Sequence, residues 1–276
     1  MALKFMYITN RPDIARIAED AGVERIFVDM EYIGKADRQG GMDTVQSNHT
    51  LEDVTAVRKV LTKAQLVVRC NPIHNKTEEY LGSREEIEQI IARGADVIML
   101  PYFKTVEEVR KFIEYVDGRA ITLPLVETPE AVDCIDEILE LPGIDEIFVG
   151  LNDLSLGYGL SFMFELLADG TVDKLCEKFK KKGIPYGFGG IASLGKGTLP
   201  SEYVIMEHYR LGSTCAILSR SFCNAMRITD AKEISRIFTK GVREIRDYER
   251  KCMSHPELYK ENRKKACELI REIVES

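Results

Sequence analysis

Apolar runs that suit a β-strand recur along this chain, and a stretch that suits an amphipathic helix, or a place for one, follows each of them. The eight candidate strands cover residues 4–9, 25–31, 65–71, 96–101, 120–127, 146–151, 185–189 and 214–219. The candidate helices between them cover residues 12–21, 51–62, 83–92, 106–116, 129–140, 173–182 and 201–211. Strands that alternate with helices pair in parallel, and eight such units predict an α/β fold of the (β/α)8 TIM-barrel type.

The main alternative to the barrel is a doubly wound open sheet. That fold usually has fewer strands and a glycine fingerprint directly after its first strand. Here the first candidate strand runs into Thr9-Asn-Arg-Pro12, which has no such pattern. We therefore expect residues 1–226 to form one barrel domain that carries the active site.

The last fifty residues have a different character and form a second segment, residues 227–276. Two highly charged helices are expected over 230–251 and 257–274, with apolar residues at helical spacing. That apolar stripe consists of Ile234, Ile237, Phe238, Val242 and Ile245. A barrel needs only one helix after its eighth strand, so the stripe packs either on its own barrel or on a neighbouring subunit. We expect the second, and hence a homo-oligomer formed through these helices.

Composition excludes several classes of protein. The net charge of −7 argues against a nucleic-acid surface, and no apolar run approaches the roughly 20 residues of a membrane span. The start of the chain does not resemble a secretory signal. Seven cysteines without a Cys-x-x-Cys pair argue against a zinc site and indicate free thiols in a reducing cytoplasm.

Polar side chains follow the apolar part of several candidate strands. Strand alternation puts Asp29 and Glu31 on one face with Phe27, and Arg69 on one face with Val67. Glu127 ends the fifth strand, and Asp153 follows the sixth. Barrel enzymes carry catalytic groups at these strand ends, so we expect Asp29, Glu31, Arg69, Glu127 and Asp153 to converge on one mouth of the barrel.

Glu127 and Asp153 are the candidate metal ligands. A carboxylate at the end of a buried strand is costly unless its charge is compensated, and two of them suit a hard divalent cation in an open site. Both residues also precede turns, so a role at a helix N-cap or in a first helical turn is the alternative. Arg69 could instead be a structural ion-pair partner of Asp29 or Glu31, and Asp29 could be only an orienting acceptor.

Six segments carry a resemblance to a known family. They are Val28-Asp-Met-Glu31, Val68-Arg69, Gly94-Ala-Asp-Val-Ile-Met-Leu-Pro101, Val126-Glu-Thr-Pro-Glu-Ala131, Pro142-Gly-Ile-Asp145 and Phe148-Val-Gly-Leu-Asn-Asp-Leu-Ser155. In this order, over roughly residues 5–225, the chain resembles the HpcH/HpaI aldolase and citrate lyase beta family. The Glu-Thr-Pro and Gly-x-x-Asp-Leu-Ser pieces are fairly specific as a pair.

The resemblance implies a barrel that holds Mg²⁺, Mn²⁺ or a similar cation such as Co²⁺ through Glu127 and Asp153. It implies that Arg69 contacts the carbonyl or enolate oxygen of a 2-oxo acid, and that backbone amides around Gly150, Asn152 and Asp153 hold the substrate carboxylate. Cleavage of a carbon–carbon bond beside a carbonyl leaves an enolate, whose oxygen needs a Lewis acid and a fixed cation.

The chain departs from the aldolase branch at two positions. That branch normally has histidine after Asp-x-Glu and glutamine two residues before the metal-binding glutamate; here Tyr32 and Leu125 stand there. A phenol is a poor general base at neutral pH, although it can donate a hydrogen bond or act as an acid. Candidate replacement bases are His49 and His74, and the alternative for each is a histidine in a surface loop. Of the two we prefer His74, which comes five residues after Arg69 and is expected on the catalytic rim. The expected catalytic residues are thus Arg69, Asp29, Tyr32 and His74.

The segment 187–198 is rich in glycine. Loops after strands seven and eight often bind phosphate in barrels, and glycines let backbone amides approach an anion. We expect Gly189, Gly190 and Ser193 to bind substrate, with Lys196 and Ser219-Arg220 nearby, and a phosphorylated or carboxylated substrate is a hypothesis. A mobile lid or a plain connection is the alternative.

We expect a metal-dependent carbon–carbon lyase that cleaves or forms a 2-oxo acid, such as a 4-hydroxy-2-oxo acid, through a pyruvate enolate. Val68-Arg-Cys-Asn-Pro72 leans toward the citrate lyase beta branch, so an acyl-CoA thioester lyase is the second hypothesis. A non-catalytic barrel that keeps the metal site is the third, favoured by Tyr32 and Leu125.

Overall fold

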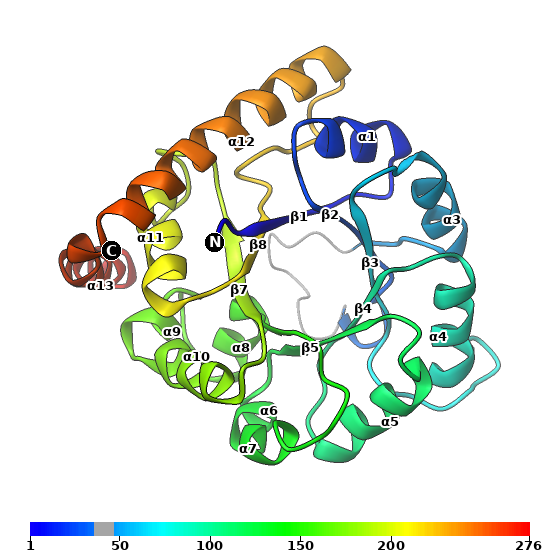
Figure 1. Cartoon of the computed structure of the whole chain (residues 1–276). Helices are drawn as coiled ribbons and strands as arrows, with labels where there is room; N and C mark the ends of the chain where they lie inside the picture. The colour runs from blue at the N-terminus through cyan, green and yellow to red at the C-terminus, as the bar shows by residue number, and fades with distance from the viewer. Residues whose placement is uncertain (36–46) are drawn as a thin grey trace.

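The strands close into one barrel. A computed structural model describes residues 1–35 and 47–276, and Figure 1 looks into its ring of strands. All pairings are parallel, the spatial order follows the chain, and the first strand closes on the last. The strands are β1 (Lys4–Ile8), β2 (Arg25–Asp29), β3 (Gln65–Arg69), β4 (Val97–Leu100), β5 (Ile121–Val126), β6 (Ile147–Val149), β7 (Tyr186–Ile191) and β8 (Cys215–Leu218). The predicted (β/α)8 barrel is confirmed.

Helices surround the barrel on its outside (Figure 1). They are α1 (Pro12–Asp20), α3 (Leu51–Val60), α4 (Ser83–Ala92), α5 (Val106–Val116), α6 (Pro129–Asp133), α7 (Ile135–Ile138), α8 (Leu151–Gly157), α9 (Glu165–Ala168), α10 (Thr171–Lys182) and α11 (Ser201–Leu211). The helix expected over 129–140 is divided at Cys134, and α8 and α9 were not expected, because helices this short have too few turns to show a periodic pattern. No helix in the described ranges is long and apolar enough to cross a membrane.

Side chains fill the inside of the barrel. Its inner cluster of buried residues consists of Met6, Phe27, Val67, Val97, Met99, Leu123, Leu125, Phe148 and Cys215. At the amino ends of the strands, the fully buried Arg25 donates to both carboxylate oxygens of Glu146, at 2.6 and 2.7 Å. The interior is therefore a packed core closed at one end by an ion pair, which leaves the carboxyl end of the strands for a site.

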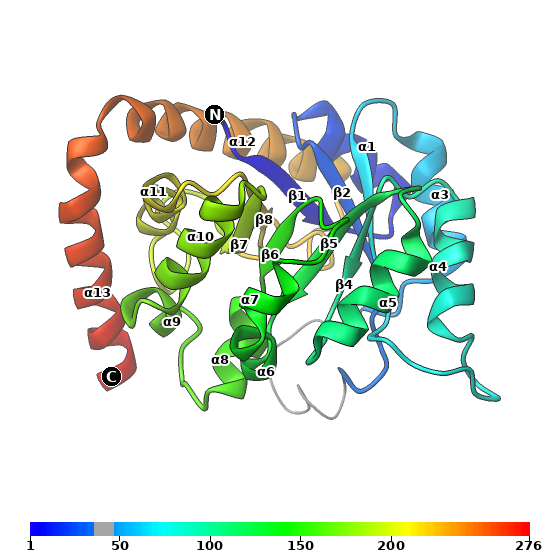
Figure 2. The same cartoon turned by 60° about the horizontal axis from the view of Figure 1, so that its bottom comes forward.

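The C-terminal helices pack on the chain's own barrel. Helix α12 (Ala231–Ser254) lies against α1 and α11 (Figure 1). After the 3-10 turn η1 (Pro256–Leu258), α13 (Tyr259–Glu275) runs beside α11 and α9 (Figure 2).

The expected packing of the apolar stripe on a neighbouring subunit is wrong. Of its five members, Ile234, Phe238, Val242 and Ile245 are buried within this chain, and Ile237 packs against the same core. The Phe238 ring, for example, meets the edge of Tyr7 on β1 at 4.8 Å between ring centres. The stripe packs inward because α12 lies against both α1 and α11 on the outside of the barrel. The stripe therefore gives no reason to expect a second subunit.

Candidate active site

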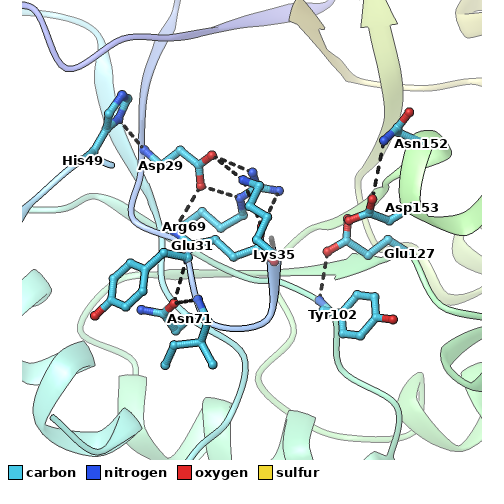
Figure 3. Close-up of polar contacts among 12 residues, drawn as sticks. Asp29, Glu31, Lys35, His49, Arg69, Asn71, Tyr102, Glu127, Asn152 and Asp153 are labelled. Carbon is cyan, nitrogen blue, oxygen red and sulfur yellow. Dashed lines mark hydrogen bonds and ion pairs between the residues drawn. The ribbon is translucent and has the colours of Figure 1, made fainter. Parts of the chain in front are cut away.

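A cavity of about 430 Å³ opens at the carboxyl ends of the strands. Apolar side chains of the barrel core form its floor, among them Phe27, Met99, Leu125 and Phe148. Its polar lining consists of Asp29, Lys35, Ser47, Arg69, Glu127, Asn152, Asp153, Ser219, Arg220 and Asn224. Apart from Arg220, the charges fall into two groups, an acidic wall and a cationic wall, which Figure 3 shows on opposite sides.

The acidic wall consists of Glu127 and Asp153, whose carboxylates lie close together in Figure 3. Glu127 follows β5, is buried, and accepts a hydrogen bond from the Tyr102 backbone N–H at 2.9 Å. Asp153 is buried in the first turn of α8. Burial, then Glu31 and Asp153 as like charges, raise the pKa of Glu127 well above its usual value despite the opposing charge of Arg69. Two such carboxylates form a site that favours a cation.

Two backbone features, at Gly150 and Tyr102, accommodate the Glu127 side chain. A Cβ atom on Gly150 would lie 2.7 Å from Glu127 Oε2, so the absence of a side chain there leaves room for the carboxylate. Tyr102 has a φ of 48°, a left-handed conformation that is uncommon for a residue with a side chain. Its N–H makes the bond to Glu127, which places a strained residue at the candidate site.

The cationic wall consists of Arg69 and Lys35 and is held by two buried carboxylates. Arg69 binds Asp29 through two hydrogen bonds, Nε to Oδ1 at 2.8 Å and Nη2 to Oδ2 at 2.7 Å. Its Nη1 lies 3.3 Å from Glu31 Oε2. Lys35 Nζ lies 2.9 Å from Asp29 Oδ2 and 3.4 Å from Glu31 Oε2. The two cations thus share the same two carboxylate oxygens.

These contacts fix the protonation of the wall. Burial raises the pKa of Asp29, but the charge and hydrogen bonds of Arg69, and then of Lys35, outweigh it and hold that pKa well below its ordinary value. Burial lowers the pKa of Arg69, but Asp29 and Glu31 outweigh it and raise that pKa well above its ordinary value. At neutral pH Asp29 is therefore an anion and Arg69 a cation, so Asp29 orients Arg69 rather than accepting a proton.

The loop after β2 is tied to the loop after β3. The Asn71 side-chain oxygen accepts hydrogen bonds from the backbone N–H groups of Tyr32 and Ile33, both at 3.0 Å. The Asn71 amide in turn donates to the buried Glu86 at 2.8 Å. Asn71 therefore fixes the backbone just before Lys35. This gives part of the Arg-Cys-Asn-Pro segment a structural role.

Most of the predicted site residues come together. Asp29, Arg69, Glu127, Gly150, Asn152, Asp153, Gly189 and Gly190 all line the cavity. Of the alternatives raised for these residues, the ion pair of Arg69 with Asp29 and the first-turn position of Asp153 are both present. Neither excludes a functional role, since both residues also face the cavity. Glu127 does not cap α6, because the hydroxyl of Thr128 does.

Three predicted residues lie elsewhere. Tyr32 is 41% exposed and its ring packs 5.4 Å from that of Tyr80, outside the cavity lining. His74 lines a separate shallow depression, and its ring nitrogens lie 2.7 Å from the carbonyl oxygens of Pro72 and Leu81. The chain turns there to meet α4, which directs this histidine away from the strand ends.

Ser193 is the third residue that does not face the cavity. Its hydroxyl donates to the Phe222 carbonyl oxygen at 3.1 Å, and Lys196 is also absent from the lining. Of the groups expected to hold an anion, Gly189, Gly190, Ser219 and Arg220 line the cavity. The glycine-rich segment is therefore only partly turned toward the cavity.

His49, the less favoured histidine, is closer to the site than His74. Its Nδ1 accepts a hydrogen bond from the backbone N–H of Asp29 at 2.9 Å (Figure 3), so its proton is on Nε2. Burial lowers the pKa of His49. The ring does not line the cavity and supports the Asp29 backbone instead.

Sequence reasoning missed Lys35, Ser47 and Asn224 in the cavity lining, and it missed the bond from Tyr102 to Glu127. Lys35 lies six residues after Asp29, the last residue of β2, where strand alternation no longer indicates a direction. The sequence did indicate that a second cation was needed, because Asp29 and Glu31 share a strand face and carry more negative charge than Arg69 alone can neutralise.

The donor set fits a divalent cation. Among the described residues, four carboxylates of the site (Asp29, Glu31, Glu127 and Asp153) stand beside three cations (Arg69, Lys35 and Arg220). Arg69 and Lys35 are both engaged by Asp29 and Glu31, and Glu127 and Asp153 add two further carboxylates to the cavity. No cluster of three or more His, Cys, Asp or Glu side chains with metal-binding geometry occurs within 1–35 and 47–276. An ion here would need oxygen ligands from water or substrate besides Glu127 and Asp153.

Comparison with known proteins identifies the family. The model of the HpcH/HpaI aldolase/citrate lyase family matches residues 5–163, which is more than half of the chain. The chain belongs to this family. Among curated proteins, 2-keto-3-deoxy-L-rhamnonate aldolases of Escherichia coli, including those of strains HS and K12, are 27% identical over 28% of this chain. The matched part spans 40% of the length of those relatives.

Solved structures of HpcH/HpaI proteins share the fold. An HpcH/HpaI aldolase from Desulfitobacterium hafniense has a TM-score of 0.59 at 17% identity, covering 88% of this chain and 92% of its own. An HpcH/HpaI aldolase/citrate lyase family protein from Burkholderia cenocepacia also has a TM-score of 0.59, at 15% identity over 88% and 95%. Macrophomate synthase has a TM-score of 0.54 at 16% identity, over 79% of this chain and 77% of its own.

Proposed function

We propose that this HpcH/HpaI protein is a divalent-cation-dependent carbon–carbon lyase of the aldolase type. It cleaves or forms a 2-oxo acid, such as a 4-hydroxy-2-oxo acid, through the enolate of pyruvate. The relatives named as aldolases favour this class of reaction. Seven free cysteines suit a reducing compartment, and we place the protein in the cytoplasm.

One observation carries the proposal: the acidic pair Glu127 and Asp153 and the cation Arg69 line the same cavity. An enolate needs positive charge at its oxygen, and Arg69 supplies a permanent one. Glu127 and Asp153 would hold the divalent cation, which supplies a Lewis acid for the same negative oxygen. The apolar floor keeps water away from that charge and strengthens these interactions.

The other residues have supporting roles. Asp29 fixes the guanidinium plane of Arg69 through two hydrogen bonds, and Glu31 adds a second contact. Backbone amides near Gly150 and Asn152 would bind the substrate carboxylate beside the acidic wall. Leu125 lies in the floor, so the glutamine of the aldolase branch has no polar counterpart at this position.

Exchange of the methyl protons of pyruvate tests the proposal without knowledge of the second substrate. The protein is incubated with pyruvate and Mg²⁺ in D₂O, and loss of the C3 proton signal is followed by NMR. We expect exchange that needs the divalent cation and that falls by about 100-fold in Glu127→Gln, the range typical for loss of an electrostatic stabiliser. Glu130→Gln is the matched control, because Glu130 is an exposed carboxylate of α6.

A panel of substrates then separates the hypotheses. Release of pyruvate from 4-hydroxy-2-oxo acids, lost in Glu127→Gln, supports the aldolase. Cleavage of malyl-CoA or citramalyl-CoA with no activity on the first panel would replace it with a thioester lyase. Metal binding without proton exchange or cleavage of either panel would mean a non-catalytic barrel.

A further inference from the structure

The proposed reaction needs a group that exchanges a proton with C3 of the 2-oxo acid. None of the three residues expected to supply that group places it in the cavity. Tyr32 lies outside the cavity, His74 lines another depression, and His49 uses its Nδ1 on the Asp29 backbone. Of the described residues that line the cavity, none is a histidine, and Lys35 is the one lysine.

Lys35 is built into the site. Its side chain is 5% exposed, and burial of an ammonium group is costly unless carboxylates compensate it. Asp29 at 2.9 Å and Glu31 at 3.4 Å provide this compensation. An ammonium has three N–H donors, and Asp29 and Glu31 are the carboxylates that engage them among residues 1–35 and 47–276, while Lys35 also lines the cavity where a substrate would lie.

Other donors in the lining are poorer candidates. The hydroxyl of Tyr7 donates to the Cys223 carbonyl oxygen at 3.1 Å, and burial raises the pKa of Tyr7 well above its usual value. Burial also raises the pKa of the Cys223 thiol, to about 11. Arg69 stays protonated because Asp29 and Glu31 surround it. Lys35 thus differs from its neighbours in combining a transferable proton, a fixed position and access to the cavity.

We propose that Lys35 is a catalytic residue that exchanges the C3 proton of the 2-oxo acid, an inference that rests on the proposed function. When the enolate is quenched, C3 takes a proton from Nζ of Lys35. The C–H bond forms from the enolate C=C electron pair, the carbonyl is restored, and Lys35 becomes a neutral amine that regains a proton from water. With pyruvate alone the step also runs in reverse, as the amine takes a C3 proton and leaves the enolate.

Two reactions of the full-length protein with Mg²⁺ separate this role from a structural one. Exchange of pyruvate protons in D₂O needs removal of a C3 proton, whereas decarboxylation of oxaloacetate reaches the same enolate by loss of CO₂. We expect Lys35→Met to lower exchange by about 100-fold or more, as for loss of a general acid–base group, and to leave decarboxylation within about threefold. Lys35→Arg, which keeps the charge but not a transferable proton, should lose exchange as well.

Rescue and pH dependence give further readouts. Ethylamine added to Lys35→Ala should restore part of the exchange, increasingly so at higher pH. The charged and titratable groups around Lys35 in the described part of the chain are Asp29, Glu31, Arg69 and His49.

The outcomes that overturn the proposal are distinct. Exchange retained within about threefold in Lys35→Met, full exchange in Lys35→Arg, or an equal fall of exchange and decarboxylation would each remove Lys35 from proton transfer. Decarboxylation without exchange in the native protein would do the same and leave the proposed function standing. Neither reaction in the native protein would overturn the proposed function, and Lys35 with it.

Discussion

Glu127 occupies the space that a side chain on Gly150 would need. A Cβ atom at residue 150 would lie 2.7 Å from Glu127 Oε2 and 2.8 Å from Glu127 Cβ. The φ of Gly150 is −84°, which any residue can adopt, so space rather than backbone conformation requires the glycine. The glycine in the turn after β6 therefore leaves the space that the Glu127 carboxylate, which follows β5, occupies.

Gly150→Ala should therefore displace the Glu127 carboxylate and weaken metal binding. We expect a loss of about 10-fold in Mn²⁺ affinity, the lower end for disturbed support of a ligand, measured by isothermal titration calorimetry. The control is Glu127→Gln with and without Gly150→Ala. If the alanine acts through Glu127, it should lower Mn²⁺ affinity little further in the Glu127→Gln background. A loss of affinity as large as in the native background would contradict this account.

Asp29→Asn should lower both stability and proton exchange, because it removes the anion that holds Arg69 and Lys35. Breaking a buried ion pair costs about 3 kcal/mol in the free energy of unfolding, measured by urea denaturation. Glu146→Gln breaks the comparable pair with Arg25 at the other end of the barrel. It should cost similar stability but leave pyruvate exchange per folded molecule unchanged, and equal loss of exchange in both variants would argue against a specific role of Asp29.

Stability should fall in acid because of His208. This residue is buried, stacks on Phe188 at 3.9 Å between ring centres, and burial lowers its pKa from 6.5 to about 3. Below pH 6.5 His208 binds a proton in the unfolded chain but stays neutral in the folded chain. Stability that is present above pH 6.5 is therefore lost as the pH falls toward 3. His208 alone should remove about 2 kcal/mol between about pH 7 and about pH 5.

The comparison for His208 is His208→Gln, which does not titrate. The difference in unfolding free energy between the two proteins, measured by denaturation across this pH range, should shrink or change sign in acid. A difference that is independent of pH would show that His208 is already protonated in the folded protein or accessible to water.

Glu207 should control the attachment of α13. It is fully buried on α11, accepts two hydrogen bonds from Arg210 and one from Asn262 at 3.0 Å, and lies 3.6 Å from Arg263. Glu207→Gln should raise the hydrogen exchange of α13 by about 10-fold or more, since a buried charged network loses its anion. Asp136→Asn, which breaks an exposed pair with Lys178, should have no such effect.

Much of the barrel could be predicted because strands have a simple alternation. The faces assigned to Phe27 and Asp29, to Val67 and Arg69, and to Leu125 and Glu127 are those seen, with all six residues in the cavity or the inner core. The active-site side of each strand followed from this period of two. The sequence therefore predicted which charged residues of the strands face the active-site end of the barrel.

Loops and helix partners could not be predicted in this way. Lys35 reaches the site because Asn71 holds the preceding turn, and His74 leaves it because Ser83 holds the following one. These contacts join residues between 9 and 39 positions apart through irregular segments, so no periodic pattern records them. The packing of α12 was also misjudged, because an apolar stripe shows that a helix is covered but not by which surface.

The pairing of Asp29 with Arg69 also bears on how the barrel assembles. The two residues lie opposite each other in the register of β2 and β3. A slip of one residue would turn Arg69 to the outer face and leave Asp29 buried without its main partner, at a cost of several kcal/mol. The ion pair that orients Arg69 in the cavity thus also disfavours misaligned strands during folding. A variant that replaces both residues by apolar ones should lose fidelity of strand alignment.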